Sequence, residues 1–253
     1  MYQSTATRFR TVQDTPELSD AHCHLNLFEN PEQTVKECAA HGMKIILATG
    51  GSSKDNLQVS ELAHGDIVFG IVGISPDFVQ EQNGINELAK LVKENRKIIG
   101  IGEIGLDFKI TQDEKQVERQ KEVFEQQIVI AKELELPIVI HSRGSLHEVF
   151  RILDKNNVKR AMFHFFEGNG SDAKELESRG YIMSVPPVEN SKRKDAIRHI
   201  DLKNIVVETD SPVVGKTPLD VNRSLEMISK IREIEVSELA RVTTDNLREF
   251  FYI

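Results

Sequence analysis

The sequence predicts an α/β protein of the (β/α)₈ class, a single TIM barrel. Its 253 residues match the roughly 250 residues of one such barrel. Short apolar runs alternate with longer amphipathic stretches along the chain. The runs at 45–48, 138–140 and 205–207 are continuously apolar, which is typical of parallel strands buried on both faces. These observations leave a closed barrel or a doubly wound sheet, and we expect the barrel.

Each strand and helix is placed from its local pattern. Apolar, β-branched runs predict strands at residues 18–22, 44–49, 67–73, 98–103, 137–141, 159–164, 181–185 and 204–208. Amphipathic stretches predict helices at residues 32–41, 53–64, 84–94, 113–135, 145–156, 171–179, 190–200, 218–232 and 236–251. Thr217 and Pro218 have the order of a helix N-cap and a first helical residue. No linker rich in Pro, Gly or Ser divides the chain, so residues 1–253 are expected to form one domain, with 1–17 as an N-terminal arm.

Composition limits the function without naming it. A net charge of −8 argues against a protein that coats nucleic acid through bulk electrostatics, but allows an enzyme that holds a few phosphates locally. The two cysteines form no CxxC pair, which suits a reducing compartment. No stretch approaches the ~20 apolar residues of a membrane span. We therefore expect a cytoplasmic protein without membrane association.

Five predicted strands end in side chains that can bind a metal. The candidates are His22, His24, Glu103, His141, His164 and Asp210. In a barrel the carboxyl ends of the strands meet at one mouth, so these residues would converge there. Buried carboxylates and imidazoles gathered in one place are costly unless a cation neutralises them. Histidine-rich ligation is typical of zinc or manganese more than of magnesium.

Five segments in order resemble the signature blocks of the TatD family, which are metal-dependent deoxyribonucleases with an amidohydrolase-like barrel. They are Asp20-Ala-His-Cys-His-Leu25, Gly102-Glu-Ile-Gly-Leu-Asp107, His141-Ser-Arg143, His164-Phe-Phe-Glu-Gly168 and Glu208-Thr-Asp-Ser-Pro212. The closing segment Thr244-Asp-Asn-Leu-Arg-Glu-Phe-Phe251 is similar to that family's C-terminal helix. Any one block is a weak motif, but five in order, spanning the chain from Asp20 onward, are specific.

The resemblance implies a site with two divalent metal ions (Mg, Mn or Zn) and 3′-5′ exonuclease-like hydrolysis of DNA. His22, His24, Glu103 and Asp210 would hold one ion. Glu103, His141 and His164 would hold the other, so that Glu103 is shared. Asp210 would also orient the attacking water and accept its proton, which makes Asp210 and Glu103 the expected catalytic residues.

Three positions depart from the family pattern, and all three lie in the expected substrate region. Ser75 stands where a histidine is usual, Asn26 where the first block normally has aspartate, and Glu167 where serine is common. These changes spare the metal ligands. They leave the identity of the substrate open.

Cationic side chains are candidates for substrate binding. Arg143 follows a metal ligand by two residues and could clamp an anion or pair with a loop acid. Lys192 and Arg193 open the helix after the seventh strand, where they would face either the solvent or the substrate. We expect these three residues and Ser75 at the mouth of the barrel.

Two alternatives remain open at this point. One is an ester or amide hydrolase, such as a D-aminoacyl-tRNA deacylase, using the same metals. The other is a barrel that binds metal without catalysis, which the complete set of ligands disfavours. The expected partner is DNA or another phosphodiester, and no obligate protein partner is indicated.

Overall fold

The strands form one parallel sheet that curves into a barrel, in a computed structural model that describes residues 17–81 and 84–253. The strands of the described residues are β1 Leu18–Cys23, β2 Met43–Thr49, β3 Val68–Val72, β4 Ile98–Asp107, β5 Ile138–Arg143, β6 Ala161–Phe163, β7 Ile182–Val185 and β8 Ile205–Val207. They are hydrogen-bonded in chain order from β1 to β8, and each pair is parallel. The sequence-based fold class is therefore confirmed.

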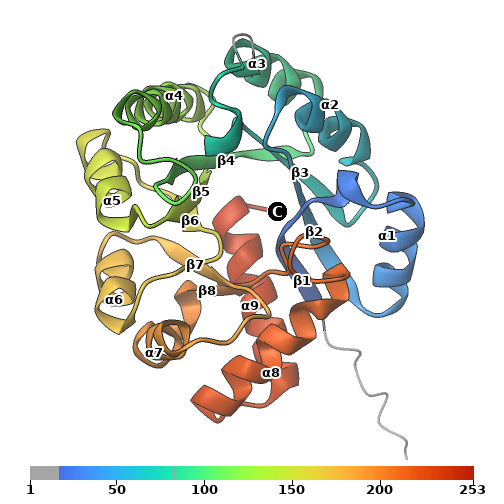
Figure 1. Cartoon of the computed structure of the whole chain (residues 1–253). Coiled ribbons are helices and arrows are strands. Elements are labelled where there is room, and N and C mark those ends of the chain that lie inside the picture. The colour runs from blue at the N-terminus through green and yellow to red at the C-terminus, as the bar shows by residue number, and fades with distance from the viewer. Residues whose placement is uncertain (1–16, 82–83) are drawn as a thin grey trace, which may run out of the picture.

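Helices surround the barrel as an outer ring (Figure 1). The α-helices are α1 Pro31–Ala40, α2 Ser53–Leu62, α3 Gly84–Glu94, α4 Glu114–Glu133, α5 Leu146–Lys155, α6 Gly170–Ser178, α7 Ser191–His199, α8 Val221–Arg232 and α9 Val236–Phe251. Short 3₁₀ helices are η1 Leu25–Leu27, η2 Pro76–Phe78, η3 Leu202–Asn204 and η4 Pro218–Asp220. Several α-helices begin where an Asn, Ser or Asp side chain accepts a bond from the first turn, as at Asn30, Ser52 and Asp113, because such caps satisfy otherwise unpaired amides.

Hydrogen bonds between the segment after β8 and β1 close the barrel. The Asp210 amide donates to the His22 carbonyl at 2.8 Å, and the His24 amide donates to the Ser211 carbonyl at 2.8 Å. The buried Asp20 carboxylate also accepts from the Thr209 amide at 2.9 Å. The two ends of the sheet are therefore joined at the same place where three candidate ligands emerge.

Two apolar layers follow from the alternation of side chains along each strand. In β2, Ile45 and Leu47 belong to the cluster inside the barrel, whereas Ile46 and Ala48 belong to the cluster between strands and helices. The continuously apolar runs of the sequence thus fill both layers.

Helix α9 covers the amino-terminal end of the barrel. Its Leu247, Phe250 and Phe251 join the inner cluster, and the Thr244 hydroxyl donates to the Glu17 carbonyl at the entry to β1, at 3.1 Å. In Figure 1 this helix is seen through the ring of strands. With this end filled by apolar side chains, the opposite end is left for a site.

The expected strands and helices are present, with two main differences. Strand β4 continues past Glu103 to Asp107, because it stays paired with β5 up to the pair Asp107 and Arg143. The helix expected from residue 218 begins as the 3₁₀ helix η4, whose N-cap is Thr217. Except for residue 17, the predicted N-terminal arm lies outside the described residues. Among the helices of the described part of the chain, none is long and apolar enough to cross a membrane.

Truncating Leu247 to alanine is expected to destabilise the protein by ~2–5 kcal/mol, because Leu247 is fully buried against the barrel interior and a cavity would remain. The matched control is Leu57→Ala on α2, whose side chain is 52% exposed and should cost less than about 0.5 kcal/mol. Urea unfolding of both variants measures the difference. Equal losses of unfolding free energy in the two variants would contradict the conclusion that α9 fills the amino-terminal end of the barrel.

Candidate metal centre

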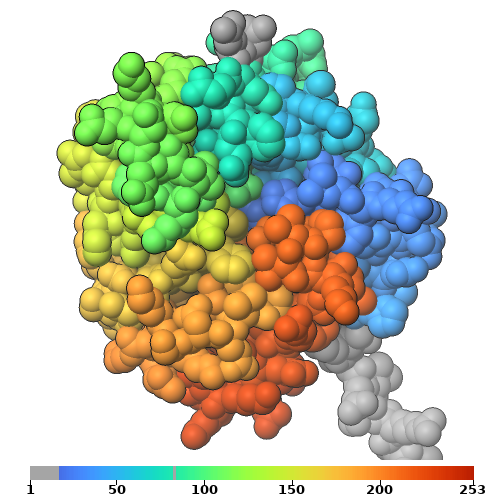
Figure 2. Space-filling model, in the orientation of Figure 1, coloured from blue at the N-terminus to red at the C-terminus, as the bar shows by residue number. Residues whose placement is uncertain are grey.

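The carboxyl ends of the strands surround a cavity of about 750 Å³. Figure 2 shows the molecule in the orientation of Figure 1, with the orange segment after β8 beside the blue segment after β1 near the middle of the visible face. The residues predicted to bind metal meet at this cavity: His22, His24, Glu103, His141, His164 and Asp210. Five of them line it, and His22 is fully buried against them.

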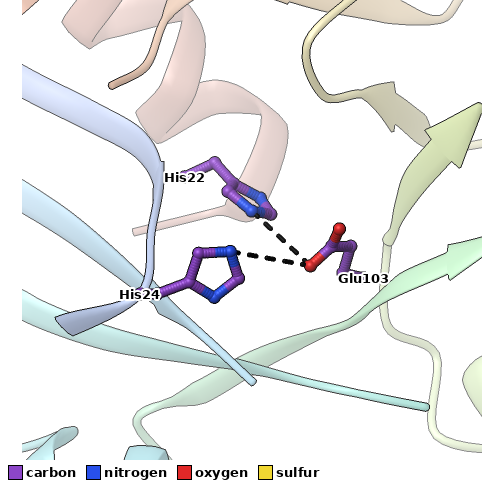
Figure 3. A group of neighbouring side chains, drawn as sticks. All are labelled: His22, His24 and Glu103. Carbon is purple, nitrogen blue, oxygen red and sulfur yellow. Dashed lines mark ion pairs between the residues drawn. The ribbon is translucent and has the colours of Figure 1, made fainter. Parts of the chain in front are cut away.

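The carboxylate of Glu103 lies between two pairs of imidazoles. Its Oε2 is 3.8 Å from Nε2 of His22 and 3.8 Å from Nε2 of His24 (Figure 3). Its Oε1 is 3.0 Å from Nδ1 of His141 and 3.4 Å from Nε2 of His164. Each oxygen therefore faces a different pair, and the two halves of the site share one carboxylate.

Asp210 joins the half of the site formed by the first strand. Its Oδ1 is 3.3 Å from Nε2 of His24 and 3.8 Å from Nε2 of His22. The residue is buried and has a left-handed backbone with φ 51°, a conformation that Asn and Asp tolerate better than most residues. This turn aims its carboxylate into the cavity.

A second layer of polar groups holds the imidazoles in place. The carbonyl of Thr49 is 3.1 Å from Nδ1 of His24, and Asp107 Oδ2 is 3.0 Å from Nε2 of His141. Glu208, which is fully buried, has Oε2 3.7 Å from Nδ1 of His164. Such outer partners fix the ring orientation and the tautomer of a metal-binding histidine.

Sequence reasoning missed Asp107 and Glu208 as members of the site. Both stand in quoted motifs, at the end of Gly102–Asp107 and at the start of Glu208–Pro212. Asp107 follows Glu103 by four residues at the end of β4, and Glu208 comes two residues before Asp210. That spacing was the available signal.

Burial and hydrogen bonding shift the pKa values of this cluster in opposite directions. Burial would raise the pKa of Glu103, but hydrogen bonds with His141 and His164 outweigh it and hold that pKa well below its usual range. Burial likewise opposes the charged form of His141, but Asp107 and Glu103 raise its pKa to about 9. The pKa of His22 lies well below its ordinary value because the ring is buried and other imidazoles surround it.

The donor set fits divalent cations. Both ring nitrogens of His22 are buried without a hydrogen-bond partner, an arrangement that is costly unless something else satisfies them. Among the described residues four groups of three have ligand atoms within 4.8 Å of one another. Two of these groups consist of predicted ligands only, namely His22, His24, Glu103 and Glu103, His141, His164. Imidazole nitrogens and carboxylate oxygens are the ligands of zinc and manganese sites.

Gly105 allows β4 and β5 to approach closely enough to build this site. Its φ is 142°, and a Cβ at this position would overlap the carbonyl oxygen of His141. Only glycine fits such a backbone without strain. The residue therefore sets the distance between Glu103 on β4 and His141 on β5.

The predicted substrate residues are distributed over three environments. Arg143 and Ser75 line the cavity, and Nη1 of Arg143 is 3.9 Å from Asp107 Oδ2. Lys192 lines an adjoining hollow of about 220 Å³, which shares Ser142, His164 and Glu167 with the cavity. Arg193 was expected at the mouth of the barrel, where it could bind the substrate, and this expectation is wrong. The Arg193 side chain is buried, donates to the Val188 carbonyl and lies 4.9 Å from the centre of the Phe165 ring.

The two other departures from the family pattern also have a place in the structure. Asn26 Nδ2 donates to Asp55 Oδ1 at 3.0 Å and to Gln58 Oε1 at 3.3 Å. An aspartate at position 26 would set a second carboxylate against Asp55, so asparagine suits its neighbour. Glu167 is exposed and lines the cavity.

A parallel eight-stranded barrel with buried imidazoles and carboxylates at the carboxyl ends of its strands defines the class of metal-dependent hydrolase barrels. Residues 19–252 match the family model described as TatD related DNase. The chain belongs to the TatD family of metal-dependent hydrolases.

Similar proteins cover almost the whole chain. An uncharacterized metal-dependent hydrolase, MJ1582 of Methanocaldococcus jannaschii, is 32% identical over 92% of this chain and 96% of its own length. Deoxyribonuclease TATDN3 of Homo sapiens is 30% identical over 92% of this chain and 94% of its own length. The crystal structure of YJJV, a TatD homolog from Escherichia coli, has a TM-score of 0.85 at 23% identity, over 93% of this chain and 98% of that one. At that identity the structural likeness shows the fold alone.

Metal binding is expected to release protons and to strengthen as the pH rises. The raised pKa values of His141 (about 9) and His164 mean that both rings keep their protons at neutral pH in the metal-free protein. A metal competes with those protons for a ring nitrogen. Affinity for Zn²⁺ or Mn²⁺ should therefore increase as the pH rises from 6 toward the pKa of His141, about 9. Calorimetric titration in two buffers with different ionisation enthalpies measures the protons released.

The matched variant is Asp107→Asn, which removes the negative charge beside Nε2 of His141. In this variant the pKa of His141 should fall, and the rise in metal affinity should move to lower pH. If the wild-type protein releases no proton at pH 7, or if its affinity is flat from pH 6 to pH 9, the electrostatic description of this cluster is wrong.

Proposed function

We propose that this chain is a deoxyribonuclease that hydrolyses phosphodiester bonds with two divalent cations. The observation that carries the proposal is the placement of Glu103, with one oxygen toward the His22–His24 pair and the other toward the His141–His164 pair. A shared carboxylate of this kind is the usual centre of a two-cation site. The name of the human relative, a deoxyribonuclease, supports the substrate class.

In this proposal His22, His24, Glu103 and Asp210 hold one cation, and Glu103, His141 and His164 hold the other. Two divalent cations activate water for attack and stabilise the charge that develops on a phosphoryl group. The histidine-rich donors favour zinc or manganese, and the family resemblance adds magnesium. The cytoplasmic location expected from the sequence stays a prediction.

Asp210 is the candidate general base. Its carboxylate lies at the edge of the cavity, 3.3 Å from Nε2 of His24, and keeps one side open to the cavity. A carboxylate in this position can orient a water molecule with one oxygen and take its proton. Arg143, which also lines the cavity, can bind a non-bridging phosphate oxygen through its guanidinium.

Asp210→Asn is expected to fold and bind metal, and to lose at least about a hundredfold in kcat, because general-base catalysis contributes ~10²–10⁴-fold. Asparagine tolerates the left-handed backbone of this position, so the variant tests chemistry rather than folding. Asp66→Asn, an exposed position outside the cavity, is the matched control. Full rescue by excess metal would leave Asp210 as a ligand only, and near-normal activity would overturn the site assignment.

The substrate class is tested by comparing a nitrophenyl phosphodiester with an aminoacyl ester at the same metal concentration. The proposal requires metal-dependent turnover of the phosphodiester and of single-stranded oligonucleotides, with shortening from the 3′ end. Turnover of the aminoacyl ester alone would favour the deacylase alternative. Metal binding without turnover of either substrate would favour a non-catalytic barrel.

A further inference from the structure

The mouth of the cavity is unusually apolar for a site that acts on a polyanion. Nine large apolar side chains of the described residues are exposed, and five of these line this one cavity. They are Leu27, Phe78, Ile110, Val213 and Val214, which we call the apolar rim. Exposed apolar groups gathered in one place mark a binding surface more often than scattered ones do.

The rim is assembled from loops that are distant in the sequence. Leu27 ends η1 after β1, Phe78 ends η2 after β3, and Ile110 follows β4. Val213 and Val214 lie in the segment after β8. Figure 2 shows these segments in blue, cyan, green and orange around the middle of the visible face. A core function does not explain such placement, because these side chains are between 37% and 64% exposed.

The charges of the cavity do not match an extended nucleic-acid backbone. Of the lysines and arginines in the described residues, Arg143 alone lines it. Carboxylates of Asp55, Asp77 and Glu167 line it as well. Of the other predicted cations, Arg193 is buried and Lys192 lines the adjoining hollow rather than the cavity itself. Phosphates on either side of the scissile one would meet more acidic groups than cations here.

We propose that the apolar rim binds the nucleobases flanking a single scissile phosphate, so that the enzyme recognises short or single-stranded ends through bases rather than through their backbone. This inference rests on the proposed phosphodiesterase function and assigns it a mode of substrate recognition. Phe78 provides an aromatic face that is 42% exposed, and every base can stack on such a face whatever its sequence. The phosphate itself is held at the metal centre and by Arg143.

The direct test compares thymidylyl-thymidine, which has one phosphodiester and two bases, with the same dinucleotide lacking both bases. Stacking of a base contributes roughly 5- to 150-fold in affinity, so the wild-type KM should be at least about fivefold lower for the substrate with bases. Phe78→Ala should raise KM for the substrate with bases by a similar factor, with kcat little changed. Its KM for the abasic dinucleotide should equal that of the wild-type protein. Phe78→Trp should restore KM.

Tyr252→Ala is the matched control, because Tyr252 is an exposed aromatic residue outside the cavity lining. It should leave both KM values unchanged. The salt dependence gives a second readout. The slope of log kcat/KM against log salt should be the same for a dodecathymidylate as for the dinucleotide, because one phosphate is contacted in both cases.

The outcomes separate the two proposals. If wild-type protein turns over neither dinucleotide nor the dodecathymidylate with Mg²⁺, Mn²⁺ or Zn²⁺, the phosphodiesterase function is wrong and the rim proposal falls with it. Turnover of the dodecathymidylate alone overturns only the rim proposal. If the wild-type protein turns over both dinucleotides with the same KM, only the rim proposal is overturned. The same holds if Phe78→Ala raises KM equally for both dinucleotides. A salt slope that steepens with oligonucleotide length would also overturn it, by showing that flanking phosphates are bound.

Discussion

The site is organised by one buried carboxylate, that of Glu103. A carboxylate in this position is costly to bury unless positive or hydrogen-bonding groups surround it, and four imidazoles from three other segments of the barrel do so. That requirement explains why β4 runs close to β5 at Gly105, where a side chain would overlap the His141 backbone. The rest of the centre is arranged around the two oxygens of this group.

The barrel and the centre depend on each other at the junction of β8 and β1. The hydrogen bonds from Asp210 to His22 and from His24 to Ser211 are the bonds that close the sheet, and three of these residues are also candidate ligands. Closure therefore fixes the position of the ligands on β1 relative to Asp210. Outside this ring, Asp107 and Glu208 set the orientation of His141 and His164, so that the active rings are held by the fold rather than by a flexible loop.

Much of this structure could be predicted from the sequence, because its signals are local. Continuously apolar runs predicted several strands, as at 138–140 and 205–207. The candidate ligands stand at or near the ends of predicted strands, so that the barrel topology was enough to bring them together. The burial of Arg193 could not be predicted from its neighbours in the sequence. Its burial depends on how the first turn of α7 packs against Phe165, which lies in a different loop. The apolar rim could not be predicted for the same reason, because four loops contribute to it and loop side chains follow no regular spacing in the sequence.

The most direct measurement of the central claim is a crystal structure of the protein grown with Mn²⁺, with anomalous scattering used to locate the metal. We expect two anomalous peaks on opposite sides of the Glu103 carboxylate, one near His22, His24 and Asp210 and the other near His141 and His164. A single peak, or two peaks of which neither contacts Glu103, would contradict it. Glu103→Gln under the same conditions should lose at least one of the two peaks while the barrel remains folded.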